Sequence, residues 1–121
     1  MLKVAHHGAA NGVTVELLEA TTPCLATMGV GPHNGGGGHT ARGYGHPNRW
    51  AMEALRDGVS GSRPRRDIMV FDRANVDPRR MQASSAIFGT AWDGHHVIYA
   101  TGSGRCSVVS EREGEVDVTC P

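Results

Sequence analysis

The sequence has few aromatic residues and no long apolar run. Phe, Trp and Tyr make up only 5% of its 121 residues, and glycine is abundant at 17, so the apolar material available for a core is limited. No stretch approaches the roughly 18 consecutive apolar residues of a membrane helix. Residues 1–8 have neither the basic nor the apolar region of a secretory leader. We therefore expect one untargeted domain without a membrane segment.

The sequence has no excess of positive or negative charge and no paired cysteine motif. Lys and Arg total 12, as do Asp and Glu, so no net field favours nucleic acid or a membrane surface. Cys24, Cys106 and Cys120 are odd in number and contain no C-x-x-C pair. This pattern argues against a disulfide framework and against a thiolate zinc site. A reduced, cytoplasmic location is the expectation.

The order of the apolar segments predicts an α/β fold. Residues 2–5 and 24–30 are apolar runs typical of strands, and residues 13–20 between them have the spacing of an amphipathic helix. This β-α-β order favours two parallel strands joined by a right-handed crossover. A second helix is predicted over residues 47–58, with Pro47 in its first turn, and a third strand over residues 67–72.

Other segments are predicted to lie at the surface or to form hairpins. Residues 34–45 contain six glycines and are expected to form a loop. Residues 60–85 look like a variable surface insertion, in which Arg63, Arg65 and Arg66 are solvated. Trp50 has the helical spacing of a core residue. The chain should end in a β-meander whose first turn contains Asp93-Gly94, with strands at residues 86–91, 95–101, 105–110 and 115–120.

Histidine is the residue type that points to chemistry. Five of the seven histidines follow predicted strands in two groups, which are His6 with His7, and His33, His39 and His46. Loops at the carboxyl ends of parallel strands carry the sites of α/β proteins, and neutral imidazole is a ligand for zinc or manganese. Solvated loop histidines are the competing interpretation, which applies most to His33 and His39. His95 and His96 are expected to be structural.

Several short motifs together resemble one protein family. They are Leu-Lys-Val-Ala-His-His-Gly at residues 2–8, Ala-Thr-Met-Gly-Val-Gly at 26–31, Asn34, Tyr-Gly-His-Pro at 44–47 and Thr-Ala-Trp-Asp-Gly at 90–94. In this order the motifs resemble the C-terminal part of metallo-β-lactamase-fold hydrolases. The most similar members are the hydrolase domains of competence-type DNA-internalisation proteins and their soluble relatives. The resemblance covers roughly residues 1–110.

The resemblance implies a fold, a site and a reaction. Residues 1–121 would form a single, incomplete metallo-β-lactamase-like domain, a partial αββα half with β-α-β-α-β followed by antiparallel hairpins. His6, His7 and Asn34 would act in catalysis, and His7 and His46 would bind a divalent metal, zinc or manganese, for hydrolysis of a phosphodiester or related ester. Ala9 and Met28 depart from the serines usual in the family.

The family's H-x-H-x-D-H and Gly-Asp metal motifs do not occur in this sequence. The chain is therefore expected to be a hydrolase fragment that is inactive by itself. The alternative is a non-catalytic α/β remnant or binding module. Either interpretation allows a partner at an exposed sheet edge, which would be the complementary N-terminal half or another copy of the chain.

Overall fold

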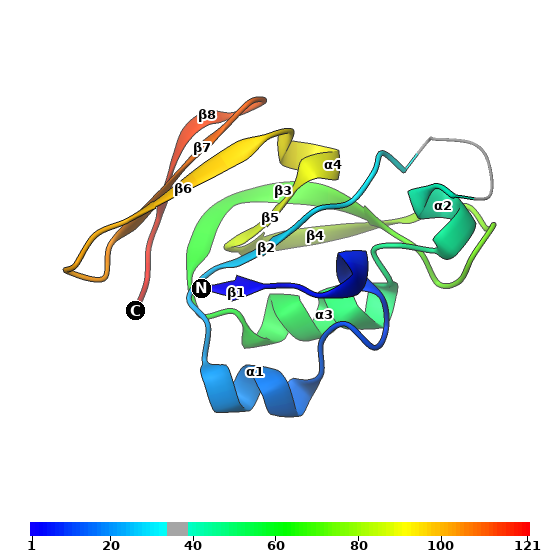
Figure 1. Ribbon diagram of the computed structural model, residues 1–121, viewed down its shortest axis with the longest axis horizontal. Helices are drawn as coiled ribbons and strands as arrows, with labels where there is room; N and C mark the ends of the chain where they lie inside the picture. Colours follow the sequence, from blue (N-terminus) through cyan, green and yellow to red (C-terminus); the bar gives the residue numbers. More distant parts are fainter. Residues whose placement is uncertain (34–38) are drawn as a thin grey trace.

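The computed structural model describes residues 1–33 and 39–121, which form a mixed α/β fold (Figure 1). The elements in chain order are β1 (Leu2–Lys3), η1 (His6–Gly8), α1 (Val15–Thr21), β2 (Ala26–Met28), α2 (Ala41–Tyr44), α3 (Arg49–Gly58), β3 (Ser62–Val70), β4 (Arg79–Ser85), β5 (Ile87–Gly89), α4 (Thr90–Asp93), β6 (His96–Ala100), β7 (Cys106–Ser110) and β8 (Gly114–Val118). Within the described residues, no helix is long and apolar enough to cross a membrane.

A small parallel sheet positions the histidine loops. Its strand order is β1-β2-β5, with Leu2 opposite Ala26 and Thr27 opposite Phe88. The predicted β-α-β unit is confirmed, because α1 connects β1 to the parallel strand β2. Figure 1 shows η1 and α2 on the same side of the molecule, beyond the ends of β1 and β2. The loops that follow these two strands therefore face a common region.

The predicted hairpin around Asp93-Gly94 is wrong. β5 joins the parallel sheet beside β2, whereas β6 pairs with β7, and the short helix α4 separates β5 from β6. The Asp93 side chain is buried and accepts a hydrogen bond from the Gly89 backbone amide at 3.1 Å. Asp93 is thus held inside the fold and is not part of a surface turn. The later antiparallel pairs, β6-β7 and β7-β8, agree with the predicted meander.

The segment 60–85, predicted to be a variable surface insertion, has regular secondary structure. It forms the long antiparallel hairpin β3-β4, in which Ile68, Met81 and Ala83 belong to the core. Buried positions alternate with more exposed ones over residues 68–70 of β3 and 81–84 of β4, so one face of the hairpin packs on the core there. Whether the segment varies among related chains stays a prediction.

Arg63 is buried, which contradicts its assignment to a solvated surface. Its guanidinium donates two hydrogen bonds to the Asp93 carboxylate, at 2.8 and 2.9 Å, and its carbon Cζ lies 3.9 Å from the centroid of the Phe88 ring. Arg66 adds a contact to Asp93 at 3.3 Å. This ion pair connects the hairpin β3-β4 to α4.

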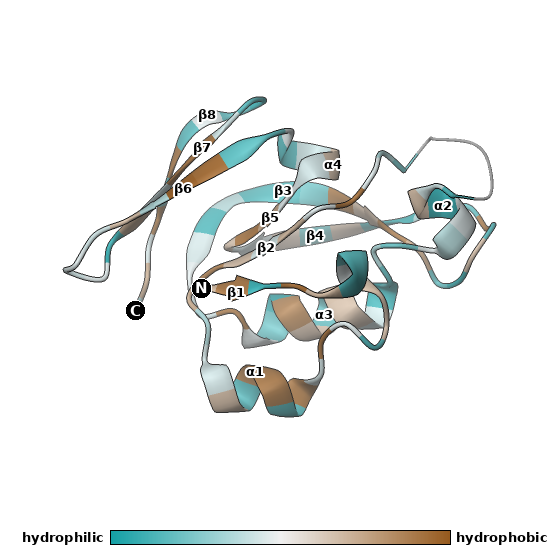
Figure 2. Ribbon diagram, in the orientation of Figure 1, coloured by the Kyte–Doolittle hydropathy of each residue, from teal (hydrophilic) through white to brown (hydrophobic). Residues whose placement is uncertain are grey.

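Helix α3 packs on the core with a face that excludes Trp50. The Asn48 side chain caps the helix by accepting from the Trp50 amide at 3.0 Å. Ala51, Met52 and Leu55 are the buried positions, whereas Trp50 is 53% exposed, so its prediction as a core residue is wrong. Figure 2 shows apolar residues on α1 and α3, the two helices that contact each other.

Cys24 and Cys120 form a disulfide, contrary to the expectation from the cysteine pattern. Cys24 lies two positions before β2 and Cys120 lies two positions after β8, so the bond spans 96 positions of sequence. Cys106 is a free cysteine. Cysteine spacing could not show this pair, because the two residues meet only through the tertiary fold. The cytoplasmic location stays a prediction, although stable disulfides are uncommon in that compartment.

Replacing both Cys24 and Cys120 with serine is expected to lower the free energy of unfolding by about 2–4 kcal/mol, because the disulfide restricts the unfolded chain. Urea denaturation under non-reducing conditions measures the change. Cys106→Ser is the control, with an expected cost below about 1 kcal/mol. Equal stability of the double variant and the wild type would contradict the prediction.

Candidate functional site

His6 and His7 lie in a tight turn at the carboxyl end of β1. Both residues and Gly8 have positive φ angles of 51°, 55° and 76°, so the chain reverses abruptly after the strand. Both histidine side chains are exposed. The turn thus presents two adjacent imidazoles at the edge of the parallel sheet.

Hydrogen bonds fix the protonation pattern of these two rings. Nδ1 of His7 lies 2.7 Å from the backbone oxygen of Gly29, the residue that follows β2, and Nδ1 of His6 lies 3.1 Å from Oδ1 of Asn11. Both oxygens can only accept, so both Nδ1 atoms carry hydrogen and donate. In the neutral rings the lone pair is therefore on Nε2, which stays available for a ligand.

His46 reaches the same place from the other motif. Gly45 adopts a left-handed conformation with φ of 70°, and the following segment packs against Gly8. The Asn48 amide donates to the Gly8 carbonyl at 2.7 Å, and a Cβ at Gly8 would lie 2.9 Å from Cβ of Pro47. Only glycine permits this close approach, so Gly8 lets the two motifs meet.

The imidazoles of His6, His7 and His46 form one cluster, which we call the histidine cluster. The ring centroid of His46 lies 5.2 Å from that of His6 and 6.4 Å from that of His7. The structure therefore brings together three of the residues predicted from the sequence, although their roles stay predictions. Asn34, the fourth predicted site residue, lies outside the described residues.

The pKa of His46 is lowered from its ordinary value of 6.5. Partial burial is the main cause, since it disfavours the charged ring, and the charges of His6 and His7 act in the same direction. The folded protein thus binds fewer protons at His46 than the unfolded chain does at pH values just below 6.5. Its contribution to stability is complete above 6.5 and is lost as the pH falls.

NMR titration of the His46 ring is expected to give a midpoint below the ordinary 6.5. His6→Ala should raise that midpoint, because it removes one of the two neighbouring charges. His95→Ala is the control and should leave it unchanged, because His95 is an exposed histidine outside the cluster. A His46 midpoint at or above 6.5 in the wild type would show that burial and the neighbouring histidines do not lower the pKa of this ring.

The donor set of the histidine cluster suits a divalent metal. Two imidazoles that share a tetrahedral zinc ion, with Zn–N bonds of about 2.0–2.1 Å, have ring centroids about 5 Å apart, close to the spacing of His6 and His46. A lowered His46 pKa also favours the neutral ring that binds metal. Within residues 1–33 and 39–121, no three His, Cys, Asp or Glu side chains are close enough together to form a metal-binding group. The ring centroids of His7 and His46, at 6.4 Å, are farther apart than this spacing.

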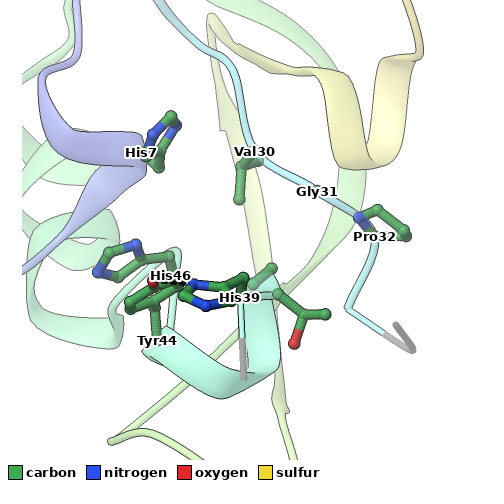
Figure 3. A pocket seen from close by; sticks show the side chains of 9 residues that line it. His7, Val30, Gly31, Pro32, His39, Tyr44 and His46 are labelled. Carbon is green, nitrogen blue, oxygen red and sulfur yellow. Dashed lines mark hydrogen bonds between the residues drawn. The ribbon is translucent and has the colours of Figure 1, made fainter. Parts of the chain in front are cut away.

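A pocket of about 340 Å³ adjoins the histidine cluster (Figure 3). Besides His7 and His46, its lining comprises Val30, Gly31, Pro32, His39, Thr40, Ala41 and Tyr44. His39, assigned to solvent from the sequence, bonds through Nδ1 to the Tyr44 hydroxyl at 2.8 Å. The sequence identified Tyr44 only as part of a motif and not as a site residue. Its place in the pocket depends on the packing of its ring beside His39 and His46, which local sequence does not show.

The remaining histidines lie elsewhere. His33 is exposed and does not line this pocket. Nε2 of His96 lies 2.6 Å from the Thr27 hydroxyl, and its ring contacts Phe88, which agrees with the structural role predicted for it. His96 therefore helps to attach β6 to the parallel sheet and is not part of the site.

Comparison with known proteins gives no further assignment, since no family model, no curated protein and no solved structure matches the chain.

Proposed function

We propose that this chain is part of a metal-dependent hydrolase of the metallo-β-lactamase type, acting on a phosphodiester or related ester. The observation that carries the proposal is the meeting of His6 and His7 with His46. The two motifs, at residues 2–8 and 44–47, are separated by 35 residues of sequence, yet the ring centroids of His6 and His46 are only 5.2 Å apart. The carboxyl edge of a parallel sheet is also where such folds place their sites.

The residues of the chain have separable tasks in this proposal. His7 and His46 bind the divalent ion, zinc or manganese, through ring nitrogens. The Gly29 carbonyl orients His7, and the Asn11 amide oxygen orients His6, which lies where it can add a third imidazole or contact the substrate. When bound, the metal would lower the pKa of a water molecule and neutralise charge on a phosphoryl oxygen.

The histidine cluster needs further ligands, which we assign to another polypeptide segment. The rings in contact within the cluster are all imidazoles, whereas the related hydrolases combine imidazoles with carboxylates. β1 is an edge strand of its sheet, so a strand of another segment or subunit can pair beside it. The same open edge supports the second candidate, a non-catalytic module that pairs with another chain.

Hydrolysis of bis(p-nitrophenyl) phosphate with added zinc or manganese tests the proposal. The chain as it stands should bind zinc but hydrolyse the ester no faster than zinc alone. Co-expression with a segment that carries an H-x-H-x-D-H motif should give turnover that His46→Gln abolishes. His95→Gln is the matched control.

Three results would count against the proposal. Turnover by the chain alone that depends on His46 would show that its site is already complete. Turnover of the combined protein that survives His46→Gln would place the chemistry elsewhere. The absence of turnover in the combined protein, with either metal, would favour the non-catalytic module.

A further inference from the structure

Four rings form a continuous row beside the pocket. The ring centroids of His6 and His46 are 5.2 Å apart, those of His46 and Tyr44 are 5.8 Å apart, and those of Tyr44 and His39 are 6.1 Å apart. The Tyr44 and His46 rings are inclined by only 21°, which is a stacked arrangement. The row leads from the histidine cluster along one wall of the pocket.

The Tyr44 ring is held in place although much of it is exposed. Its face stacks on His46, and its hydroxyl is bonded to His39 at 2.8 Å, so both the ring and its polar end are fixed. The side chain nevertheless remains 53% exposed. An ordered, exposed aromatic ring can stack with a ligand at low entropic cost, because its rotamer is already selected.

The opposite wall of the pocket is apolar. Val30 and Pro32 come from the segment after β2, and Figure 3 shows Val30 across the pocket from His39 and Tyr44. A volume of about 340 Å³ is near the lower end of ligand pockets, which span roughly 300–1,000 Å³. The pocket therefore suits one flat ring system better than an extended chain.

We infer that this pocket binds an aromatic ring system of nucleobase size by stacking on Tyr44. The inference rests on the proposed function for the reaction, since it makes the substrate an aromatic phosphate ester whose ring lies in the pocket. His7 and His46 line the same pocket, so a ring bound there is adjacent to the histidine cluster. Tyr44 is a binding residue that selects aromatic substrates.

Adenosine binding to the metal-free chain tests the inference without any hydrolysis. Titration in the presence of a chelator, followed by NMR of the protein, should show saturable binding with shifts at Tyr44 and Val30. Tyr44→Ala should weaken the binding by about fivefold or more, since stacking on one aromatic ring contributes at least this much. Tyr44→Phe keeps the ring and should stay within about twofold of the wild type.

Two controls separate stacking from general apolar binding. Tyr99→Ala removes a tyrosine of similar exposure, 56%, from β6 and should leave adenosine binding unchanged. Cyclohexanol, which is apolar but not aromatic, should bind at least about fivefold more weakly than adenosine. Equal binding of adenosine to Tyr44→Ala and wild type, equal binding of cyclohexanol, or no saturable adenosine binding would each overturn the inference.

A zinc titration of the same variants distinguishes the two proposals. Tyr44→Phe and Tyr44→Ala should bind zinc as the wild type does, because Tyr44 is not a ligand. Zinc binding without adenosine binding would refute only the aromatic pocket. Adenosine binding without zinc binding would refute the metal site. If Tyr44→Ala fails to fold by circular dichroism, Tyr44→Leu replaces it, with the same expected loss.

Discussion

Replacing His46 with alanine is expected to lower the affinity of the chain for zinc by at least about 100-fold. Loss of an outer-sphere partner alone typically costs 10- to 100-fold in metal affinity, so loss of a ligand should cost at least the upper end of that range. His46 is also the ring common to both close pairs of the histidine cluster, with His6 and with His7. Competition with a chromophoric zinc chelator at pH 7.5 measures the affinity.

His95→Ala is the matched control for this prediction, because it removes an exposed histidine from the same molecule without touching the cluster. Its zinc affinity should equal that of the wild type. A smaller and equal loss in both variants would indicate nonspecific binding to surface imidazoles. That result would contradict the specific metal binding that the proposed hydrolase requires.

Asp93→Ala is expected to destabilise the fold by about 3–5 kcal/mol, the usual cost of leaving a buried charge without its partner. The side chains of Arg63 and Asp93 are 1% and 0% exposed. Within the described residues, the substitution leaves the Arg63 guanidinium with the Ile87 carbonyl as its remaining hydrogen-bond acceptor, and it leaves the Gly89 amide without the carboxylate. Urea denaturation followed by circular dichroism gives the free energy of unfolding.

Asp67→Ala is the control for the buried pair. Asp67 and Arg80 form an exposed ion pair at 3.5 Å between β3 and β4, and such pairs contribute about 0–1 kcal/mol. If Asp93→Ala cost no more than Asp67→Ala, the Arg63–Asp93 pair would not stabilise the attachment of α4. Because this pair is distant in sequence from the histidine motifs, its loss tests the fold separately from the site.

The sequence was sufficient to predict the elements nearest the site. Apolar runs and helical spacing gave the parallel pair β1 and β2 with α1 between them, since local patterns determine those elements. The two histidine motifs were predicted to meet because the carboxyl ends of parallel strands share one edge. Their close contact also depends on Gly8, whose missing side chain admits Pro47.

The errors have a common physical origin, because they concern side chains whose environment is set by distant residues. Asp93-Gly94 has the local signature of a hairpin turn, yet the carboxylate is taken by Arg63 from β3. Cys24 and Cys120 meet only after the whole chain has folded. Trp50 has helical spacing, but the core-facing stripe of α3 is formed by other positions.

The most direct test of the metal site is a zinc titration followed by ¹H–¹⁵N NMR of the histidine rings. Our interpretation predicts that the Nε2 signals of His7 and His46 change together at one equivalent of zinc, while Nδ1 of His7 keeps the proton that it donates to Gly29. The His95 and His96 signals should stay unchanged. Zinc-induced changes confined to histidines outside the cluster, or no change at any ring, would contradict it.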